Sequence, residues 1–194
     1  MRVYPVQGAG MQRSTQLKTS FAAGLLALVA TCFGESLSPD LKLKLDARIK
    51  QLEHWSTDAE VVAAVKAHNA GLAADAKAMT QEKWQSLTVL DPFVRSYTKT
   101  PVAMSLKARN DGSISECFVS GADGTKVAFL SKTSNWSHAD KEKHRVPMAG
   151  KHWVGPVEVD QSTGQQQVQF SIPVLDGAKP IGSIVFGVSI AKLK

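Results

Sequence analysis

The sequence is poor in cysteine, in long apolar runs and, near its start, in acidic residues. Cys32 and Cys117 are the only cysteines among 194 residues. The apolar run 21–33 has 13 residues, too few to span a bilayer comfortably, and no later run approaches that task. No acidic residue precedes Glu35. These features exclude a disulfide-rich scaffold and a multi-span membrane protein.

Residues 1–34 have the layout of a secretory signal. The basic residues come first: Arg2, Arg13 and Lys18. The apolar run follows, and the small residues before Glu35 offer a cleavage site. Met11 serves as the start as well as Met1, because the first ten residues add nothing that a signal needs. We therefore predict a signal peptide over 1–34 and one domain over 35–194, in the periplasm or secreted.

Two other readings of this segment remain open. It is also compatible with an N-terminal anchor helix. A lipid anchor at Cys32 is the second alternative, although Thr31 directly before the cysteine fits that pattern poorly.

The charge of the exported part is mild. The whole chain carries +6, and removal of the signal leaves 20 basic and 17 acidic side chains, a net charge of +3. The basic residues are spread out, so nucleic-acid binding has little support. Cys117 would then be the sole cysteine, which excludes an intrachain disulfide. We interpret it as a core residue, with an exposed redox thiol as the alternative.

Motifs of common enzymes are missing. The sequence contains no GxSxG, HExxH, CxxC or phosphate-binding loop. No ordered partners for a nucleophilic serine or for Cys117 are visible. We therefore predict no catalytic residue, no cofactor and no enzymatic activity.

The first half of the domain reads as helical. Apolar residues recur at helical spacing over 39–55, after an N-cap serine and a proline at the first helical position. This amphipathic helix either packs on a sheet or pairs with a second copy of itself. Shorter helices are predicted to begin near Asp58, Thr80, Asp91 and Thr100.

From Ile114 onward the periodicity changes to two. Two strands flank the turn Asp123-Gly124, a polar segment over 132–151 follows, and three strands fill 153–193. In the middle one of these three, apolar residues alternate with polar ones. The apolar set is Val168, Phe170, Ile172 and Val174. The order predicts an α+β fold in which a long N-terminal helix packs on a five-stranded antiparallel sheet.

Several weak motifs in this order resemble the single Cache domains, also called PDC sensor domains, which have a PAS-like shape. They are Phe118-Val119 with Asp123-Gly124, Ser134-Asn135-Trp136, the segment 141–144, Pro173 to Asp176, Pro180-Ile181-Gly182 and Gly187-Val188. The resemblance covers nearly all of 41–193. It implies an extracytoplasmic sensor with a small-molecule pocket between the sheet and the loop that covers it. Unlike the family's receptors, this chain shows no second membrane helix or output domain, so we expect signalling through a partner protein.

The N-terminal helix covers only one face of the sheet, and the segment 132–151 is the only stretch between strands long enough to cover the other. We therefore expect it to be the covering loop, and it supplies the first candidate ligand residues. Trp136 and Trp153 bracket it, and aromatic rings beside a few polar groups are typical of small-ligand pockets. Lys143, His144 and Arg145 make it basic, which favours an anionic ligand such as a carboxylate. We expect Trp136 to stack on or close over the ligand. Core packing for the tryptophans and solvation for the basic residues are the alternatives.

The sheet supplies the remaining candidates. Gln167 and Gln169 share one strand face and are able to hydrogen-bond a ligand, or else face solvent. Glu116 alternates with Ile114 and Phe118, and an unpaired buried carboxylate would be costly. We interpret Glu116 as a strand-edge residue or, with Phe118, as part of a pocket wall.

Two other functions remain as alternatives to the sensor. The first is a ligand-free structural or accessory protein that keeps the same shape. The second is a metal-binding protein that uses the histidine-rich segment, with His138, His144 and His152, although their spacing fits no closed structural site. A membrane-bound signalling partner and a homodimer through the 39–55 helix are further expectations.

The export prediction is tested by N-terminal analysis of the protein released from cells. We expect the chain to begin near Glu35, or at a lipidated Cys32, because signal peptidase acts after the apolar run. An intact N-terminus recovered in the membrane fraction would contradict the prediction.

Overall fold

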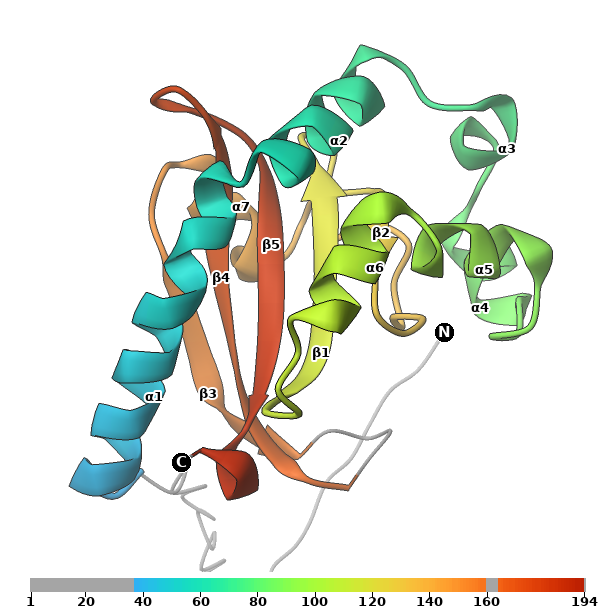
Figure 1. The fold of residues 1–194 in the computed structure, drawn as a ribbon. Coiled ribbons are helices and arrows are strands. Elements are labelled where there is room, and N and C mark those ends of the chain that lie inside the picture. The colour runs from blue at the N-terminus through green and yellow to red at the C-terminus, as the bar shows by residue number, and fades with distance from the viewer. Residues whose placement is uncertain (1–36, 160–163, 194) are drawn as a thin grey trace, which may run out of the picture. The chain divides into compact units, whose positions relative to one another are not determined.

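The computed structural model describes residues 37–159 and 164–193, and Figure 1 shows their arrangement. The predicted signal segment 1–34, with its two start candidates and Cys32, lies outside these residues. Within the described ranges, no helix combines the length and the apolar character needed to traverse a bilayer.

Five antiparallel strands form one sheet in the order β2-β1-β5-β4-β3. The strands are β1 (Ile114–Gly121), β2 (Lys126–Phe129), β3 (Trp153–Val159), β4 (Gln166–Asp176) and β5 (Lys179–Ser189). The predicted α+β class and strand number are confirmed. The β4–β5 turn contains Gly177 at φ +61°, a conformation that glycine adopts without strain. The pairing of β1 with β5, which joins the two halves of the sheet, could not be read from local patterns.

The described residues contain seven α-helices. They are α1 (Pro39–Leu52), α2 (Ala59–Ala70), α3 (Ala74–Lys77), α4 (Gln81–Ser86), α5 (Pro92–Thr98), α6 (Pro101–Ala108) and α7 (Glu142–Met148). Short 3-10 turns follow α1 and β5, namely η1 (Glu53–Thr57) and η2 (Ile190–Lys192).

Side-chain caps begin most of these helices where the sequence predicts. The capping residues are Ser38, Asp58, Thr80, Asp91 and Thr100. Each accepts a hydrogen bond from a backbone N–H of the first turn, which would otherwise lack a partner. Helix α3 was not predicted, because its N-cap residue Ala73 offers no capping side chain.

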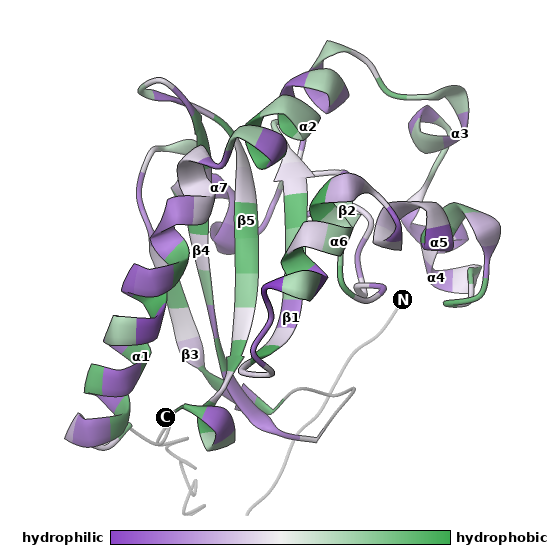
Figure 2. Ribbon diagram, in the orientation of Figure 1, coloured by the Kyte–Doolittle hydropathy of each residue, from purple (hydrophilic) through white to green (hydrophobic). Residues whose placement is uncertain are grey.

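One face of the sheet is apolar and lies against α1, η1, α2 and α6 (Figure 1). The alternating residues of β4 all point there and are almost completely buried: Val168, Phe170, Ile172 and Val174. Phe170 stacks on Phe186 of β5 at 5.0 Å between ring centroids. Figure 2 shows hydrophobic strands behind these helices, and a mixture of hydrophobic and hydrophilic residues along α1. Cys117 belongs to this core, and burial raises the pKa of its thiol well above the usual value.

The opposite face has a covering in two parts. Helix α7, from the predicted loop, packs on β3, β4 and β5. Aromatic and apolar residues from the α3–α5 region pack on Phe118, Phe129 and Val185 of the same face. We expected the segment 132–151 to be the only cover of this face, and that expectation was wrong. The chain after α2 crosses the sheet edge at β2, so α4 and α5 share the task.

The apolar stripe of α1 is used within the domain. Leu45 and Leu52 are each 4% exposed and belong to the core, whereas Leu43 is 70% exposed. The stripe that was predicted either to pack on the sheet or to pair with a second copy therefore packs on the sheet.

Substitutions at two neighbouring leucines test this assignment. Leu45→Glu should lower the free energy of unfolding by about 3 kcal/mol or more, because it buries an unpaired charge. Leu43→Glu should change it by less than about 0.5 kcal/mol. Urea titration of both variants measures the difference. Equal stability of the two variants would show that the stripe of α1 does not pack as described.

Candidate functional site

The face of the sheet opposite to the α1, α2 and α6 side is called the second face here. A cavity of about 540 Å³ opens on its polar half. Its lining comes from β1, from the β3–β4 hairpin and from the covering segment after β2. The residues that matter here are Glu116, His138, Lys143, Glu158, Gln167 and Gln169. The cavity volume is in the range of small-molecule sites.

Strand alternation places the glutamines in this cavity. Val168 and Phe170 point to the core, so Gln167 and Gln169 point to the opposite face. Gly187 pairs with Gln169 on this face, and a Cβ atom there would lie 2.5 Å from Gln167 Oε1. A glycine at this position leaves room for the glutamine side chains.

Gln169 connects a carboxylate with an ammonium group. Its Nε2 donates to Glu116 Oε2 at 2.7 Å, and its Oε1 accepts from Lys143 Nζ at 2.7 Å. Gln167 has a similar role beside it: its amide donates to Glu158 and its carbonyl accepts from Ser115. The cavity floor is therefore a row of oriented polar groups, whose geometry is held by hydrogen bonds within the domain.

A buried pair, Lys126 and His138, adjoins this cavity through His138. Lys126 is fully buried, its Nζ contacts His138 Nδ1, and it lies 4.2 Å from the centroid of the Phe118 ring. The His138 ring stacks on the same phenyl ring at 4.6 Å. Burial lowers the pKa of Lys126 well below its usual value, against the opposing effect of the Glu116 carboxylate.

His138 remains neutral in this environment. Burial and the nearby charges of Lys126 and Lys143 lower its pKa to about 2. His138 lines the cavity and contacts Lys126, so it connects the buried lysine with the cavity wall. An anion in the cavity would favour the charged forms of these groups and offset the cost of burying them.

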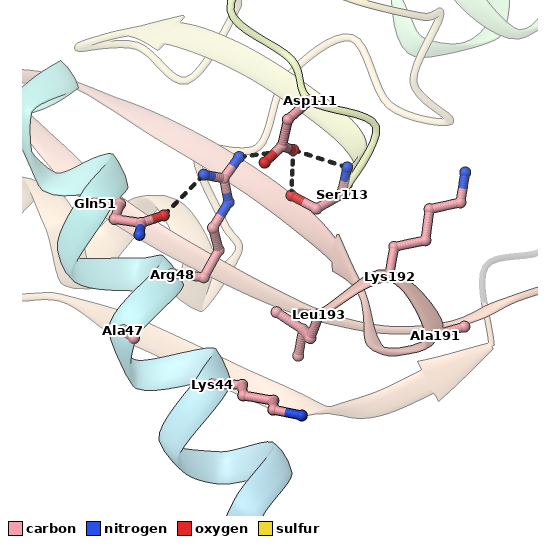
Figure 3. Close-up of a pocket in the computed structure, with 9 residues that line it drawn as sticks. All are labelled: Lys44, Ala47, Arg48, Gln51, Asp111, Ser113, Ala191, Lys192 and Leu193. Carbon is pink, nitrogen blue, oxygen red and sulfur yellow. Dashed lines mark hydrogen bonds and ion pairs between the residues drawn. The ribbon is translucent and has the colours of Figure 1, made fainter.

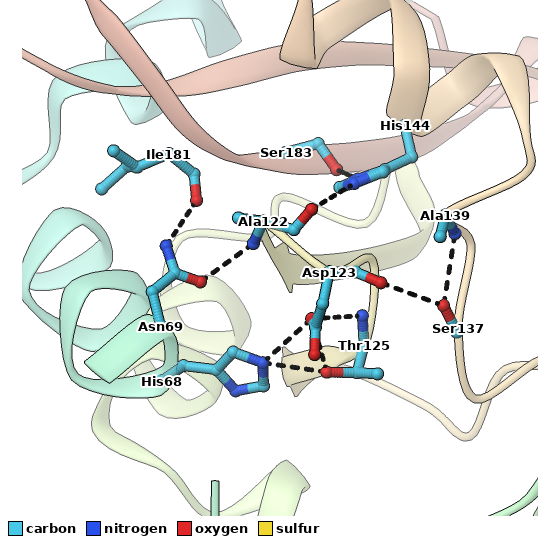
Figure 4. Close-up of polar contacts among 10 residues, drawn as sticks. All are labelled: His68, Asn69, Ala122, Asp123, Thr125, Ser137, Ala139, His144, Ile181 and Ser183. Atoms are coloured by element: carbon cyan, nitrogen blue, oxygen red, sulfur yellow. Dashed lines mark hydrogen bonds and ion pairs between the residues drawn. The ribbon is translucent and has the colours of Figure 1, made fainter. Parts of the chain in front are cut away.

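His144 ties α7 to the sheet. Its Nε2 donates to the Ala122 carbonyl at 3.3 Å, so its Nδ1 accepts from the Ser183 hydroxyl at 2.8 Å (Figure 4). Burial lowers its pKa. On the other side of the β1–β2 turn, His68 of α2 contacts Thr125 and Asp123, and Asn69 bonds Ala122 and Ile181. This network orients the turn and α7, and it lies outside the lining of the cavity.

Four of the nine predicted site residues line the cavity, and five do not. Glu116, Lys143, Gln167 and Gln169 line the cavity, and Phe118 lies behind it under Lys126. His144 is a structural contact and Arg145 is exposed. Trp153 is half-buried at the start of β3.

Trp136 packs in an aromatic cluster with Trp84, Phe93 and Tyr97, and only 4% of it is exposed. It does not line the cavity of about 540 Å³. The arrangement is the core packing that the sequence left open as its alternative, and a direct ring contact with a ligand in that cavity would require Trp136 to move.

Sequence reasoning missed Lys126, Ser115 and Glu158. Lys126 carried a signal, since it is the only charged residue of β2 and is followed directly by Val127, Ala128 and Phe129. The other two were missed because their positions depend on bulges in β1 and β3, which shift the alternation.

The three histidines of the alternative metal-binding function do not converge. His138 contacts Lys126, His144 contacts Ser183, and His152 lies 3.5 Å from Glu53. Across the described residues, no three histidine, cysteine or acidic side chains come together as metal ligands.

A second cavity, of about 460 Å³, lies between α1 and η2 (Figure 3). Arg48 spans it and bonds Gln51 and Asp111, each at 3.0 Å. Asp111 also accepts from the Ser113 hydroxyl and N–H, which, together with Arg48, lower the pKa of the carboxyl. This ion pair connects α1 to the turn before β1. It is a structural clamp, and the cavity at β4 is the better candidate for a ligand.

The low pKa values of His138 and His144 predict an acid-sensitive fold. Below about pH 6.5 both histidines are protonated in the unfolded chain but remain neutral in the native state, because their native pKa values are lowered. The free energy of unfolding therefore falls as the pH falls, by at most about 1.4 kcal/mol per pH unit for each group. His138→Gln should reduce the loss between pH 7 and pH 5 by about 1–2 kcal/mol. Urea titrations across this range measure the slope.

The same substitution at exposed His54 is the matched control and should retain the wild-type slope. Native carboxylates with lowered pKa titrate below this window, so they do not interfere. A wild-type stability that is constant from pH 7 to pH 5 would contradict the assignment.

Comparisons with known proteins give structural similarity only. No family model and no curated protein matches the sequence. The sensor domain of the Vibrio cholerae histidine kinase DctB is similar with TM-score 0.46 and 14% identity, covering 78% of this chain and 53% of the other. The ligand-binding domain of the Pseudomonas aeruginosa PAO1 amino acid chemoreceptor PctC, in complex with GABA, is similar with TM-score 0.44 and 14% identity, covering 79% of this chain and 57% of the other. The ligand-binding domain of the Campylobacter jejuni chemoreceptor Tlp3, in complex with 4-methylisoleucine, is similar with TM-score 0.38 and 12% identity, covering 79% of this chain and 56% of the other. The chain spans little more than half the length of these sensor domains.

Proposed function

We propose that this protein is an extracytoplasmic sensor module of the single Cache type, which binds a small anionic molecule and signals through a partner protein. The observation that carries the proposal is the polar cavity on the second face of the sheet, backed by the buried Lys126–His138 pair. It lies between the sheet and the covering segment, which is where the resemblance to Cache domains leads us to expect a ligand.

The charges of the cavity favour a carboxylate. Lys143 has its ammonium group at the floor, and Lys132 also lines the cavity. An incoming carboxylate is able to take the place of Gln169 as the acceptor for Lys143, and a bond between charged groups is stronger than the one it replaces. Glu116 and Glu158 on the same floor suit a ligand that also has hydrogen-bond donors.

Binding without catalysis fits the same geometry. The glutamines, Glu116, Glu158, Ser115 and Lys143 of the cavity floor are acceptors and donors held in hydrogen-bonded pairs, an arrangement suited to recognition of a ligand. Export from the cytoplasm and a membrane-bound partner are parts of the proposal that follow from the sequence alone. A homodimer remains part of it, but it would need a surface other than the stripe of α1, whose Leu45 and Leu52 belong to the core.

A ligand-free accessory protein is the second candidate, and one observation favours it. Near β2 the second face is filled by Trp84, Phe129 and Trp136, as a purely structural domain would require. The polar row along β4 favours the sensor, because a domain with only a packing role could fill this part of the face with apolar side chains, as it does near β2.

Thermal stabilisation by small carboxylates tests the sensor proposal. The panel contains acetate, pyruvate, succinate and the common amino acids, together with any molecule released from the natively purified protein and identified by mass spectrometry. A ligand at 100 times its Kd should stabilise the fold by about 2.7 kcal/mol. Lys143→Gln should weaken binding about 10- to 100-fold, through loss of a charged hydrogen bond.

Arg145→Gln is the matched control. It removes the same type of charge two residues away on α7, from an exposed side chain outside the cavity, and should keep full stabilisation. An undiminished shift in the Lys143→Gln variant would place the ligand elsewhere. The absence of any shift or released molecule would favour the accessory protein.

A further inference from the structure

A separate groove of about 560 Å³ runs between α5, α6 and the chain after β2. Its floor is apolar, since Val94 and Ala103 are each 1% exposed. Its rim carries large apolar side chains in contact with solvent, Val89 at 65% exposed and Met104 at 54%. Figure 1 shows the elements that form it side by side, at the edge of the sheet marked by β2.

The groove is also strongly basic. Four cationic side chains line it, and no acidic residue does: Arg95, Lys99, Lys107 and Lys132. None of the four forms an ion pair with another described residue, whereas the nearby Arg109 is paired with Asp58 at 3.0 Å. Lys132 places its ammonium group 4.7 Å from the centroid of the Trp84 ring, which leaves Arg95, Lys99 and Lys107 as the cations at the rim. An apolar floor beneath cations without ion-pair partners is complementary to a segment that carries apolar residues and carboxylates together.

From this complementarity we infer that the groove is a docking site for an acidic, apolar segment of a partner protein. Its concave shape favours a peptide over a lipid surface, because a flat membrane would contact the rim without reaching Val94 or Ala103. A peptide can place apolar side chains on the floor while its carboxylates meet the lysines at the rim.

The groove shares a wall with the ligand cavity. Ser131 and Lys132 line both, and the next residue, Thr133, accepts a hydrogen bond from Trp84 Nε1 at 2.8 Å. A segment bound in the groove would therefore touch the chain that borders the cavity. This connection, which rests on the proposed ligand site, gives the partner a physical means of sensing whether the cavity is occupied.

Fluorescence anisotropy with a synthetic peptide tests the docking site. The probe is a short fluorescein-labelled peptide carrying leucines and glutamates. It should bind the wild-type protein, and salt should weaken the binding. The double variant Lys99→Glu/Lys107→Glu should bind about tenfold more weakly, since each reversal removes one attraction and adds one repulsion. Met104→Gln should also weaken binding, through loss of apolar contact.

The control Lys42→Glu/Lys50→Glu makes the same charge change at exposed positions of α1 and should bind like the wild type. Thermal melting verifies that all variants are folded. Equal binding of a peptide with lysine in place of glutamate would overturn the inference, as would full binding by the groove variant. Charge-reversal-sensitive binding to phosphatidylglycerol vesicles without peptide binding would also overturn it and indicate a lipid surface. Failure here leaves the carboxylate assay unaffected, so the two proposals fail separately.

Discussion

Strand alternation in the central hairpin β4–β5 gives the sheet two chemically different faces, and the other elements are arranged around that difference. Val168, Phe170 and their neighbours require an apolar cover, which α1, α2 and α6 provide. Gln167 and Gln169, on the other side, cannot be buried against leucine without loss of hydrogen bonds. Gln169 instead forms a hydrogen bond with Lys143 of α7, and Gln167 forms one with Glu158 of the neighbouring strand β3. A cavity remains beside these groups.

The buried pair Lys126–His138 is an energetically costly part of this arrangement, because burial disfavours the charged form of both groups. Removing an ammonium group from water costs several kcal/mol, and the protein offers it a neutral imidazole, a phenyl face and the field of Glu116. A hydrophobic residue of similar size would be expected to stabilise the fold at least as well.

Much of the fold was predictable, and the reason is that its signals are local. Ser38, Asp58, Thr80, Asp91 and Thr100 each start a helix at the predicted place, since capping depends on residues three or four positions apart. The second cover, in which α4 and α5 pack on β2, was not predicted. It depends on where the chain crosses the sheet edge, and no local pattern records that crossing.

The sequence by itself determined the α+β class, the starts of the five capped helices, the turns and the division of β4 into an apolar and a polar face, because each of these follows from residues close together in the chain. Only the tertiary structure decided which polar residues form the site. Glu116 meets Gln169 through β1–β5–β4 pairing, Lys126 reaches His138 across a turn, and Trp136 turns into the core rather than the cavity. Such contacts join residues distant in sequence, and their geometry is set by sheet order and strand bulges that no short stretch of sequence encodes.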